Sequence, residues 1–216
     1  MKPKRVTLFS GHYGSGKTNI AVNYALRLAE AGLPVTVADL DIVNPYFRTK
    51  DSAEDFERAG IRLISSAYAN SNVDLPALPA ELYALTEDKS RYAVLDVGGD
   101  DRGALALGRY APAILEEGEY ESIFVANFYR PLTPNAEAAI EVMREIEIAG
   151  KIPFTAIVHN SNLGEETTAD DILAMQGEAE RLASLVSLPL LFTAADERFR
   201  DALPDAFHLR LQKKIT

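Results

Sequence analysis

Residues 10–18 of this 216-residue chain read Ser-Gly-His-Tyr-Gly-Ser-Gly-Lys-Thr. The pattern G-x-x-x-x-G-K-[ST] is satisfied here by Gly11, Gly16, Lys17 and Thr18. A short apolar run precedes the loop and a helical pattern follows it, which is the strand–loop–helix context that the pattern requires. The stretch therefore predicts a phosphate-binding loop and decides the expected fold class.

Each residue type in the loop has a physical reason. Glycine lets the backbone wrap closely, so that successive N–H groups point at phosphate oxygens. A helix beginning at Lys17 would add the positive end of its dipole. The Lys17 ammonium would neutralise the β- and γ-phosphates of a nucleotide, and the Thr18 hydroxyl would ligate Mg²⁺. The expected nucleotide-binding residues in the loop are Gly11, His12, Tyr13, Gly14, Ser15, Gly16, Lys17 and Thr18.

Strand-like and helix-like segments alternate along the whole chain. Strands are expected at residues 5–9, 34–39, 61–65, 92–97, 121–126, 153–159 and 188–193. Several are continuous apolar runs, which are typical of strands buried on both faces of a parallel sheet. Helical spacing follows residues 10–18 and recurs at 136–146, with Gly32 and Gly150 as expected stop signals. The sequence predicts one α/β domain over residues 1–216, folded as a three-layer αβα sandwich of the P-loop NTPase type.

Acidic residues end two of the expected strands. Asp39 and Asp41 lie at the end of the second strand, and Asp96 ends the fourth. The carboxyl ends of parallel strands line the ligand crevice, so these carboxylates would converge near Mg²⁺ and the γ-phosphate. Asp96 suits a metal-holding role, Asp39 or Asp41 would orient the attacking water, and the Gly99 N–H would sense the γ-phosphate. Helix capping is the competing interpretation for each aspartate.

Composition narrows the function classes. The chain has no cysteine, which excludes disulfides, thiolate zinc sites and cysteine-ligated iron–sulfur clusters. A formal net charge of −10 argues against binding to nucleic acid or to anionic membrane. No apolar run reaches the roughly 18–20 residues of a membrane span, and the N-terminus lacks the pattern of a signal peptide, so a cytoplasmic protein is expected.

Three segments together resemble the MinD/ParA/CobQ class of P-loop ATPases, the SIMIBI class with a deviant Walker A loop. They are residues 11–18, the Asp-Leu-Asp-Ile-Val-Asn-Pro run at 39–45 and Asp-Val-Gly-Gly at 96–99. Residues 191–196, followed by Arg198, are similar to the last strand and purine-side loop of that class, which includes Asp196. The resemblance implies ATP, Mg²⁺, a mainly parallel seven-stranded sheet and a nucleotide-dependent homodimer.

The resemblance also implies roles for individual residues. Thr18 and Asp96 would serve Mg²⁺, and Asp41 would position the hydrolytic water; Asp39 is expected near the metal from its place at the strand end, not from the resemblance. Asn160 matches the position that contacts adenine, and the absence of an Asn-Lys-x-Asp motif favours ATP over GTP.

One position departs from the class. His12 stands where the class has a lysine that reaches across the dimer, and Arg48, Arg102 and Arg130 are all open as replacements.

Two functions remain open at this point. The first is a Mg²⁺-dependent ATPase switch that acts on an unidentified protein partner, with residues 44–48 as a contact surface. The second is an ATP-dependent biosynthetic enzyme resembling dethiobiotin synthetase or the cobyrinate amidating enzymes. In that enzyme residues 66–90 and 127–135 would bind an acid substrate, with Arg130 as carboxylate partner. The tail at 207–214 alternates with period two, which favours a strand over a membrane-binding helix.

Overall fold

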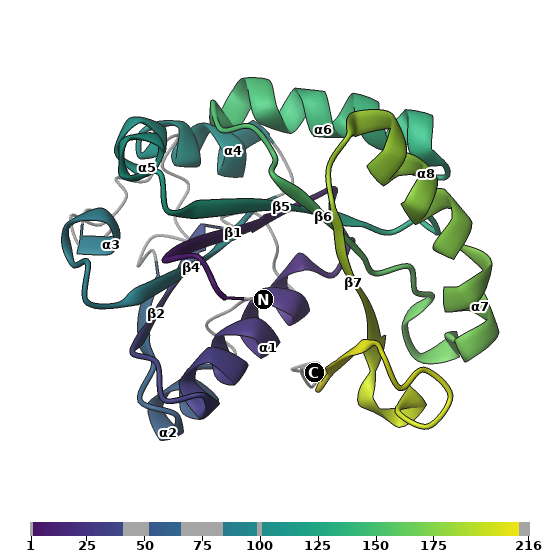
Figure 1. Ribbon diagram of the computed structural model, residues 1–216, viewed down its shortest axis with the longest axis horizontal. Helices are drawn as coiled ribbons and strands as arrows, with labels where there is room; N and C mark the ends of the chain where they lie inside the picture. The colour runs from purple at the N-terminus through teal and green to yellow at the C-terminus, as the bar shows by residue number, and fades with distance from the viewer. Residues whose placement is uncertain (1, 41–51, 66–83, 99–100, 212–216) are drawn as a thin grey trace, which may run out of the picture.

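The computed structural model describes residues 2–40, 52–65, 84–98 and 101–211. Over these ranges the chain forms a single parallel sheet of eight strands in the order β3-β2-β4-β1-β5-β6-β7-β8 (Figure 1). The strands are β1 (Val6–Ser10), β2 (Val35–Leu40), β3 (Arg62–Ser65), β4 (Tyr92–Val97), β5 (Tyr120–Ala126), β6 (Ala156–His159), β7 (Leu190–Asp196) and β8 (Phe207–Leu209). All seven neighbouring pairs run parallel, which confirms the expected P-loop NTPase-type α/β fold.

Helices cover both faces of this sheet. They are α1 (Lys17–Glu30), α2 (Ala53–Arg58), α3 (Ala84–Glu87), α4 (Asp101–Gly108), α5 (Ala111–Glu117), α6 (Ala136–Gly150), α7 (Ala169–Ala174) and α8 (Gln176–Val186), with short 3-10 turns η3 (Gly164–Glu166) and η4 (Glu197–Phe199). In Figure 1, α1 and α2 lie below the sheet, whereas α4, α5, α6 and α8 lie above it. The arrangement is the expected three-layer sandwich.

The central strands read as continuous apolar runs because both of their faces are buried. In β1, Phe9 packs into the core cluster on the α1 side, whereas Val6 and Leu8 pack into the cluster on the side of α4 and α5. The same alternation divides β4, where Val94 faces α1 and Leu95 faces the opposite layer. Burial of both faces leaves the carboxyl ends of the strands as the edge at which polar side chains can gather.

The period-two pattern at 207–214 predicted a strand in the tail, and β8 forms within that range as an eighth member of the sheet, one more than the seven strands expected. It is held against α1 by two side chains of that helix. The Arg27 guanidinium donates to the His208 carbonyl at 3.0 Å and lies 3.7 Å from the centre of the Phe207 ring. The Asn23 side chain exchanges two hydrogen bonds with the backbone of Arg210. A three-residue strand is too short to be set by its own pattern, and these contacts add it to the sheet.

Helix α6 ends differently from the expectation. Gly150 was predicted to stop the helix, but it is the last helical residue, and Lys151 takes the left-handed conformation that ends it (φ 56°). Gly150 serves packing instead, because a Cβ there would lie 3.3 Å from Leu107 Cδ2 of α4. The small residue lets α4 and α6 approach closely.

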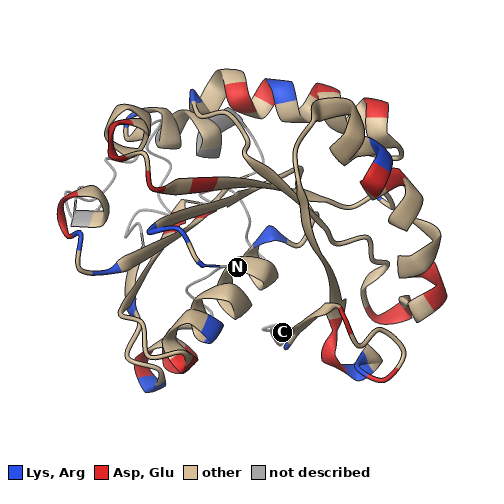
Figure 2. Cartoon of the chain, viewed as in Figure 1, with Lys and Arg blue, Asp and Glu red and all other residues tan. Residues whose placement is uncertain are grey.

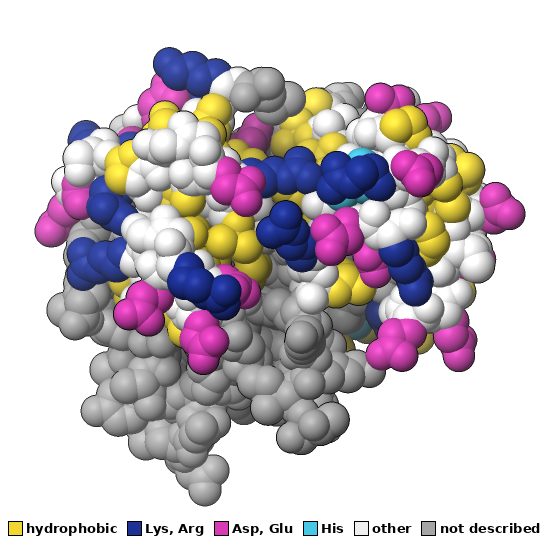
Figure 3. Space-filling model, turned by 90° about the horizontal axis from the view of Figure 1, so that it is seen from below, with side chains coloured by type: hydrophobic (Ala, Val, Ile, Leu, Met, Phe, Trp, Pro, Cys, Tyr) yellow, Lys and Arg dark blue, Asp and Glu magenta, His cyan; other side chains and the backbone are white. Residues whose placement is uncertain are grey.

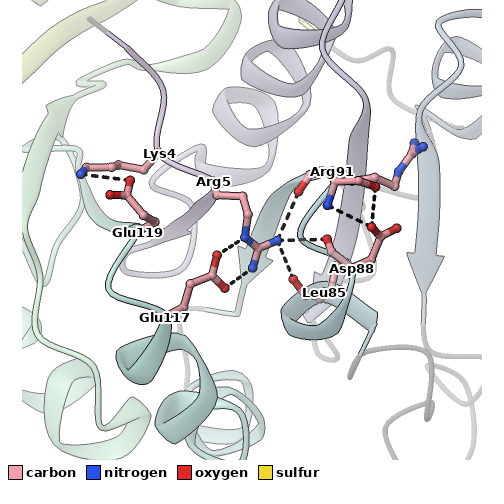
Figure 4. Close-up of polar contacts among 8 residues, drawn as sticks. Lys4, Arg5, Leu85, Asp88, Arg91, Glu117 and Glu119 are labelled. Atoms are coloured by element: carbon pink, nitrogen blue, oxygen red, sulfur yellow. Dashed lines mark hydrogen bonds and ion pairs between the residues drawn. The ribbon is translucent and has the colours of Figure 1, made fainter.

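A buried ion pair holds the start of β1 (Figure 4). The guanidinium of Arg5 forms a two-pronged pair with the Glu117 carboxylate at the end of α5, and the two side chains are only 12% and 7% exposed. The same guanidinium donates to the carbonyls of Leu85 (2.9 Å), Asp88 (3.4 Å) and Arg91 (3.2 Å). Arg5 thereby joins the strand that leads to residues 10–18 to the segments around α3 and α5.

Charged side chains are distributed over the outside of the fold. In Figure 2 the acidic residues lie mainly on the helices and loops, whereas most of the sheet is tan. Seen from below, basic and acidic side chains are interspersed across the described part of the face (Figure 3). Among the described residues of this face, acidic side chains alternate with basic ones rather than forming one acidic patch.

Candidate functional site

The glycine-rich loop joins β1 to α1 at the centre of the sheet. Gly16 is the N-cap of α1, in the left-handed conformation with φ 85°, and no side chain of the described residues caps this helix. Lys17 and Thr18 begin the helix and are 3% and 4% exposed. An uncapped helix N-terminus that starts with a buried lysine and threonine provides N–H groups, a cation and a hydroxyl at one place, which suits an anion.

Close approach of other parts of the chain explains the two outer glycines of the motif. A Cβ on Gly11 would lie 2.5 Å from the Val125 carbonyl oxygen of β5. A Cβ on Gly16 would overlap with the side-chain nitrogen of Asn160, and the φ of 85° there also disfavours any other residue. The loop therefore lies tightly between β5 and the segment that follows β6.

Two side chains from those neighbours bind consecutive carbonyls of the loop. Arg130 Nε donates to the Gly14 carbonyl at 2.8 Å, and Asn160 Nδ2 donates to the Ser15 carbonyl at 2.7 Å. Because the C=O and N–H of a trans peptide point in opposite directions, holding the Ser15 carbonyl against Asn160 turns the Gly16 N–H the other way. The shape of the loop is thus fixed from outside.

A buried hub, Asn127, connects the two segments that hold the loop, and the sequence reading did not identify it. Asn127 is 1% exposed and directly follows β5. Its Oδ1 accepts from the Tyr129 N–H (3.1 Å) and the Asn162 N–H (3.3 Å), and its Nδ2 donates to the Asn162 carbonyl at 3.3 Å. Its own carbonyl accepts from the Thr133 hydroxyl at 2.7 Å. The sequence feature that could have identified Asn127 is a polar residue directly after a continuous apolar strand.

A cavity of about 560 Å³ opens beside the loop. It is lined by Gly14, Gly16, Lys17, Thr18, Asn19, Arg130, Asn160, Asn162, Gly164, Glu165, Thr167, Ile172, Ala194, Ala195, Asp196, Arg198, Phe199, Leu209 and Leu211. The loop, the β6 segment and the ends of β7 and β8 therefore form one continuous wall. Of the expected nucleotide-binding residues outside the loop, both Asn160 and Asp196 lie on this wall.

The remaining loop residues have other surroundings. His12 is half-buried with Nδ1 3.0 Å from the Tyr13 carbonyl oxygen, and the Tyr13 side chain is 51% exposed. Gly11, His12, Tyr13 and Ser15 are not among the described residues that line the cavity. The Ser15 hydroxyl is buried, and no described group forms a hydrogen bond with it.

The far wall of the cavity is braced by Arg198. Its guanidinium donates to the carbonyls of Thr167 (2.8 Å) and Glu165 (3.1 Å), and its Nε lies 3.6 Å from Asp196 Oδ2. The Asp196 side chain also accepts from the Arg198 N–H at 3.0 Å, which makes it the N-cap of η4. Asp196 therefore caps a helical turn, the role that competes with ligand binding for aspartates at strand ends, and it also lies on the cavity wall.

The structure brings Asp39 and Asp96 side by side. They are register partners on the adjacent strands β2 and β4, and Asp96 is also the register partner of Phe9 in β1. Alternation along each strand places both aspartates on the face covered by α1, the face that Val37 and Val94 share. Asp39 is 8% exposed and Asp96 is fully buried. Two carboxylates and the hydroxyl of Thr18 are hard oxygen donors of the kind that Mg²⁺ prefers.

Several expected site residues lie outside the described ranges. They are Asp41, residues 44–48 with Arg48, most of residues 66–90, and Gly99; the side chain of Arg102 also falls outside the description. Within the described residues, no group of three or more histidine, aspartate or glutamate side chains is arranged to hold a metal ion. None of the helices in the described ranges combines the length and hydropathy needed to cross a bilayer.

A buried histidine lies directly before Asn160. His159 is fully buried, and its Nδ1 lies 3.3 Å from Gln176 Oε1 and 3.4 Å from the Thr193 hydroxyl. Burial lowers the pKa of His159 to about 4, and the bond to Gln176 opposes that shift only in part. His159 is therefore neutral at neutral pH and supports the end of β6 from the side of α8.

Solved structures share this fold. The chain aligns with the signal recognition particle receptor FtsY of Elizabethkingia anophelis in complex with GDP (TM-score 0.52, 16% identity, covering 98% of this chain and 61% of that one). It also aligns with FtsY of Thermotoga maritima (TM-score 0.57, 17% identity, 91% and 63%) and with the 54 kDa signal recognition particle protein of Aeropyrum pernix bound to GDP (TM-score 0.53, 16%, 89% and 41%).

The likeness is one of fold. The chain spans about three fifths of the length of the FtsY chains it matches. No protein-family model matches the sequence, and no curated protein sequence matches it. The P-loop NTPase-type fold expected from residues 10–18 is confirmed, and two of the matching proteins were crystallised with a nucleotide.

Proposed function

We propose that this chain is a Mg²⁺-dependent ATPase of the MinD/ParA/CobQ class that works as a nucleotide-controlled switch on a protein partner. The observation that carries the proposal is the buried Lys17–Thr18 pair at the start of α1, which opens onto a cavity of about 560 Å³. A cavity of this size suits a nucleoside triphosphate-sized ligand. The loop would bind the phosphates, and the wall from Asn160 to Asp196 would bind the base and ribose.

The polar groups after β6 favour adenine over guanine. Asn160 uses its Nδ2 on the Ser15 carbonyl, so its Oδ1, which accepts no hydrogen bond from the described residues, remains as an acceptor for the exocyclic amine of adenine. Asn162 is engaged through both side-chain atoms, with the Asn160 carbonyl and the Gly164 N–H. Residues 160–163 contain no carboxylate to pair with the N–H donors of guanine. GDP in the FtsY and 54 kDa protein structures makes GTP the competing ligand.

For hydrolysis, the chain supplies charge and position. The Lys17 ammonium would contact the β- and γ-phosphates, and the loop N–H groups would hold the same oxygens in place. Thr18 and Asp96, with Asp39 beside them, would hold Mg²⁺, which supplies Lewis-acid neutralisation of phosphate charge when bound. Asp41, next after the last residue of β2, is proposed to orient the attacking water, and the Gly99 N–H to sense the γ-phosphate.

A homodimer fits the apolar side chains around the site. Tyr13 in the loop, Leu132 after β5 and Leu163 after β6 are 51%, 59% and 44% exposed. All three lie on segments at the carboxyl edge of the sheet, the edge that carries the phosphate loop. Exposed apolar groups at one edge favour burial against a second copy when the nucleotide is bound.

The test is a binding and turnover series on the wild type, Lys17→Ala and Asp41→Ala. We expect MgATP to bind and GTP to compete more than about tenfold less well, as one well-placed polar contact can provide. Phosphate release should be slow in the wild type and absent in Asp41→Ala, whereas size-exclusion mass should still report an ATP-dependent dimer in that variant. Lys17→Ala should lose binding altogether.

Two results would count against the proposal. Preferential binding of GTP would overturn the adenine assignment. Tight ATP binding with neither hydrolysis nor dimer formation would overturn the switch and direct attention to an acid cosubstrate.

A further inference from the structure

Arg130 lies directly on the phosphate loop. It follows β5, is half-buried, and donates from Nε to the Gly14 carbonyl at 2.8 Å. The side chain covers Gly14 so closely that a Cβ there would lie 3.3 Å from Nε and 3.5 Å from Cζ. Arg130 also lines the cavity together with Lys17. The Arg130 side chain therefore contacts the loop and also lines the cavity beside it.

The two terminal nitrogens of this guanidinium form no hydrogen bond with any residue in the part of the chain that the structure describes. Its only hydrogen bond there is the one from Nε, and no described carboxylate forms an ion pair with it. Arg198, the other arginine on the cavity wall, instead has two carbonyl acceptors and a nearby carboxylate. A half-buried guanidinium has five N–H donors to satisfy, and its two terminal nitrogens match the oxygens of a phosphate.

We propose that Arg130 is a phosphate ligand of the nucleotide site, acting within its own chain. The Nε bond to Gly14 fixes the guanidinium plane, and the two terminal nitrogens bind oxygens of the nucleotide's phosphate chain. This inference rests on the proposed nucleotide-binding function and deepens it. Of the three arginines that the sequence left open, Arg130 is the one whose described position reaches the loop.

The segment that carries Arg130 is well ordered by hydrogen bonds. The Arg130 N–H donates to the Asn127 carbonyl at 3.2 Å, and the Thr133 N–H donates to the Arg130 carbonyl at 3.0 Å. Asn127 in turn is bound to Asn162. Because the backbone is held on both sides and Nε is bound to the Gly14 carbonyl, the side chain loses little further freedom when an anion binds. Lys17, Arg130 and a helix N-terminus lie together on the loop side of the cavity, and this gathering of positive charge suits a polyanion better than a single carboxylate.

The experiment measures the affinities of MgATP, MgADP and adenosine for the wild type and Arg130→Gln. Arg144→Gln is the matched control, since Arg144 is an exposed arginine of α6 with no described partner. We expect Arg130→Gln to weaken ATP and ADP about tenfold or more, as loss of a charged hydrogen bond does, and to leave adenosine within about twofold. Arg144→Gln should change none of the three affinities.

Salt dependence separates a phosphate ligand from a residue that only shapes the loop. If Arg130 contacts phosphate, the wild-type affinity for ADP falls more steeply with salt than that of Arg130→Gln, whereas Arg130→Lys keeps the steep dependence. If Arg130 only holds the Gly14 carbonyl, the variant weakens ADP by the same factor at low and high salt. Equal slopes would overturn the proposal.

The remaining outcomes distinguish the two levels of the inference. Wild-type protein that binds none of the three ligands would refute the proposed function, and this inference with it. Wild-type protein that binds ATP and ADP, together with an Arg130→Gln variant that binds them equally well, would overturn only the role of Arg130. A loss that is as large for adenosine as for ADP would assign Arg130 a structural role alone.

Discussion

Replacing Arg5 by methionine is expected to lower the free energy of unfolding by about 4 kcal/mol. Arg5 and Glu117 are 12% and 7% exposed, so removing the guanidinium leaves a carboxylate buried without its partner, which typically costs about 3–5 kcal/mol. Three backbone carbonyls around α3 lose a donor in the same change. Against a total stability of about 5–15 kcal/mol for a domain, such a loss is large.

The preceding residue provides a matched control. Lys4 pairs with Glu119, two residues after Glu117, at 3.3 Å, but the Lys4 side chain is 45% exposed and that of Glu119 is 66% exposed. Lys4→Met should therefore cost no more than about 1 kcal/mol. The double variant Arg5→Met/Glu117→Leu removes both buried charges, so it should recover most of the loss and lie within about 2 kcal/mol of the wild type.

The measurement is urea unfolding followed by circular dichroism, with the slopes compared first. If the free energy of unfolding falls with urea concentration at the same slope in all four proteins, differences in the urea midpoint can be compared as differences in stability. If Arg5→Met were no less stable than Lys4→Met, burial would not be the quantity that decides the strength of these pairs. If the double variant were as unstable as Arg5→Met, the loss would come from the carbonyls rather than from the stranded carboxylate.

Two further predictions concern residues around the loop. The pKa of His159 is about 4 in the folded chain against about 6.5 in the unfolded one, so below pH 6.5 the unfolded chain binds a proton that the folded chain does not. The free energy of unfolding should fall by about 2 kcal/mol from pH 7 to pH 5, and urea unfolding of His159→Gln should lack that part of the fall. Gly16→Ala should weaken ADP binding at least about a hundredfold in titration, because the new Cβ meets Asn160. Gly60→Ala, also at positive φ but with nothing within 4 Å, should cost only about 1–2 kcal/mol of stability in urea and leave ADP affinity unchanged.

The features that the sequence predicted well are local ones. The loop at 10–18 is set by residue types within nine positions, and the central strands are set by apolar runs that need no knowledge of their neighbours. The sequence also predicted that Asp39 and Asp96 lie close together, because the carboxyl ends of parallel strands all meet at the same edge of the sheet.

What the sequence did not predict depends on contacts between distant positions. Arg130 binds Gly14 across 116 positions and Asn160 binds Ser15 across 145, and no periodic pattern records such pairs. From the sequence alone, Asn127 looks like an ordinary turn residue; the structure shows that both atoms of its side-chain amide bind the backbone of Asn162 in a separate segment. The sequence favoured a strand in the tail, but not the attachment of β8 to α1, which uses Arg27, 181 residues from the carbonyl that it binds.

These distant contacts bear on what a glycine-rich motif can specify. The motif supplies a backbone able to wrap a phosphate, but several backbone paths meet that condition, since glycine adopts left-handed and right-handed conformations alike. Here the path is selected by Arg130 and Asn160, which hold the carbonyls of Gly14 and Ser15 from the segments that follow β5 and β6. Because Asn160 also lies on the cavity wall, one side chain couples the shape of the phosphate loop to the place proposed for the base. A change of base preference at Asn160 should therefore also change phosphate affinity.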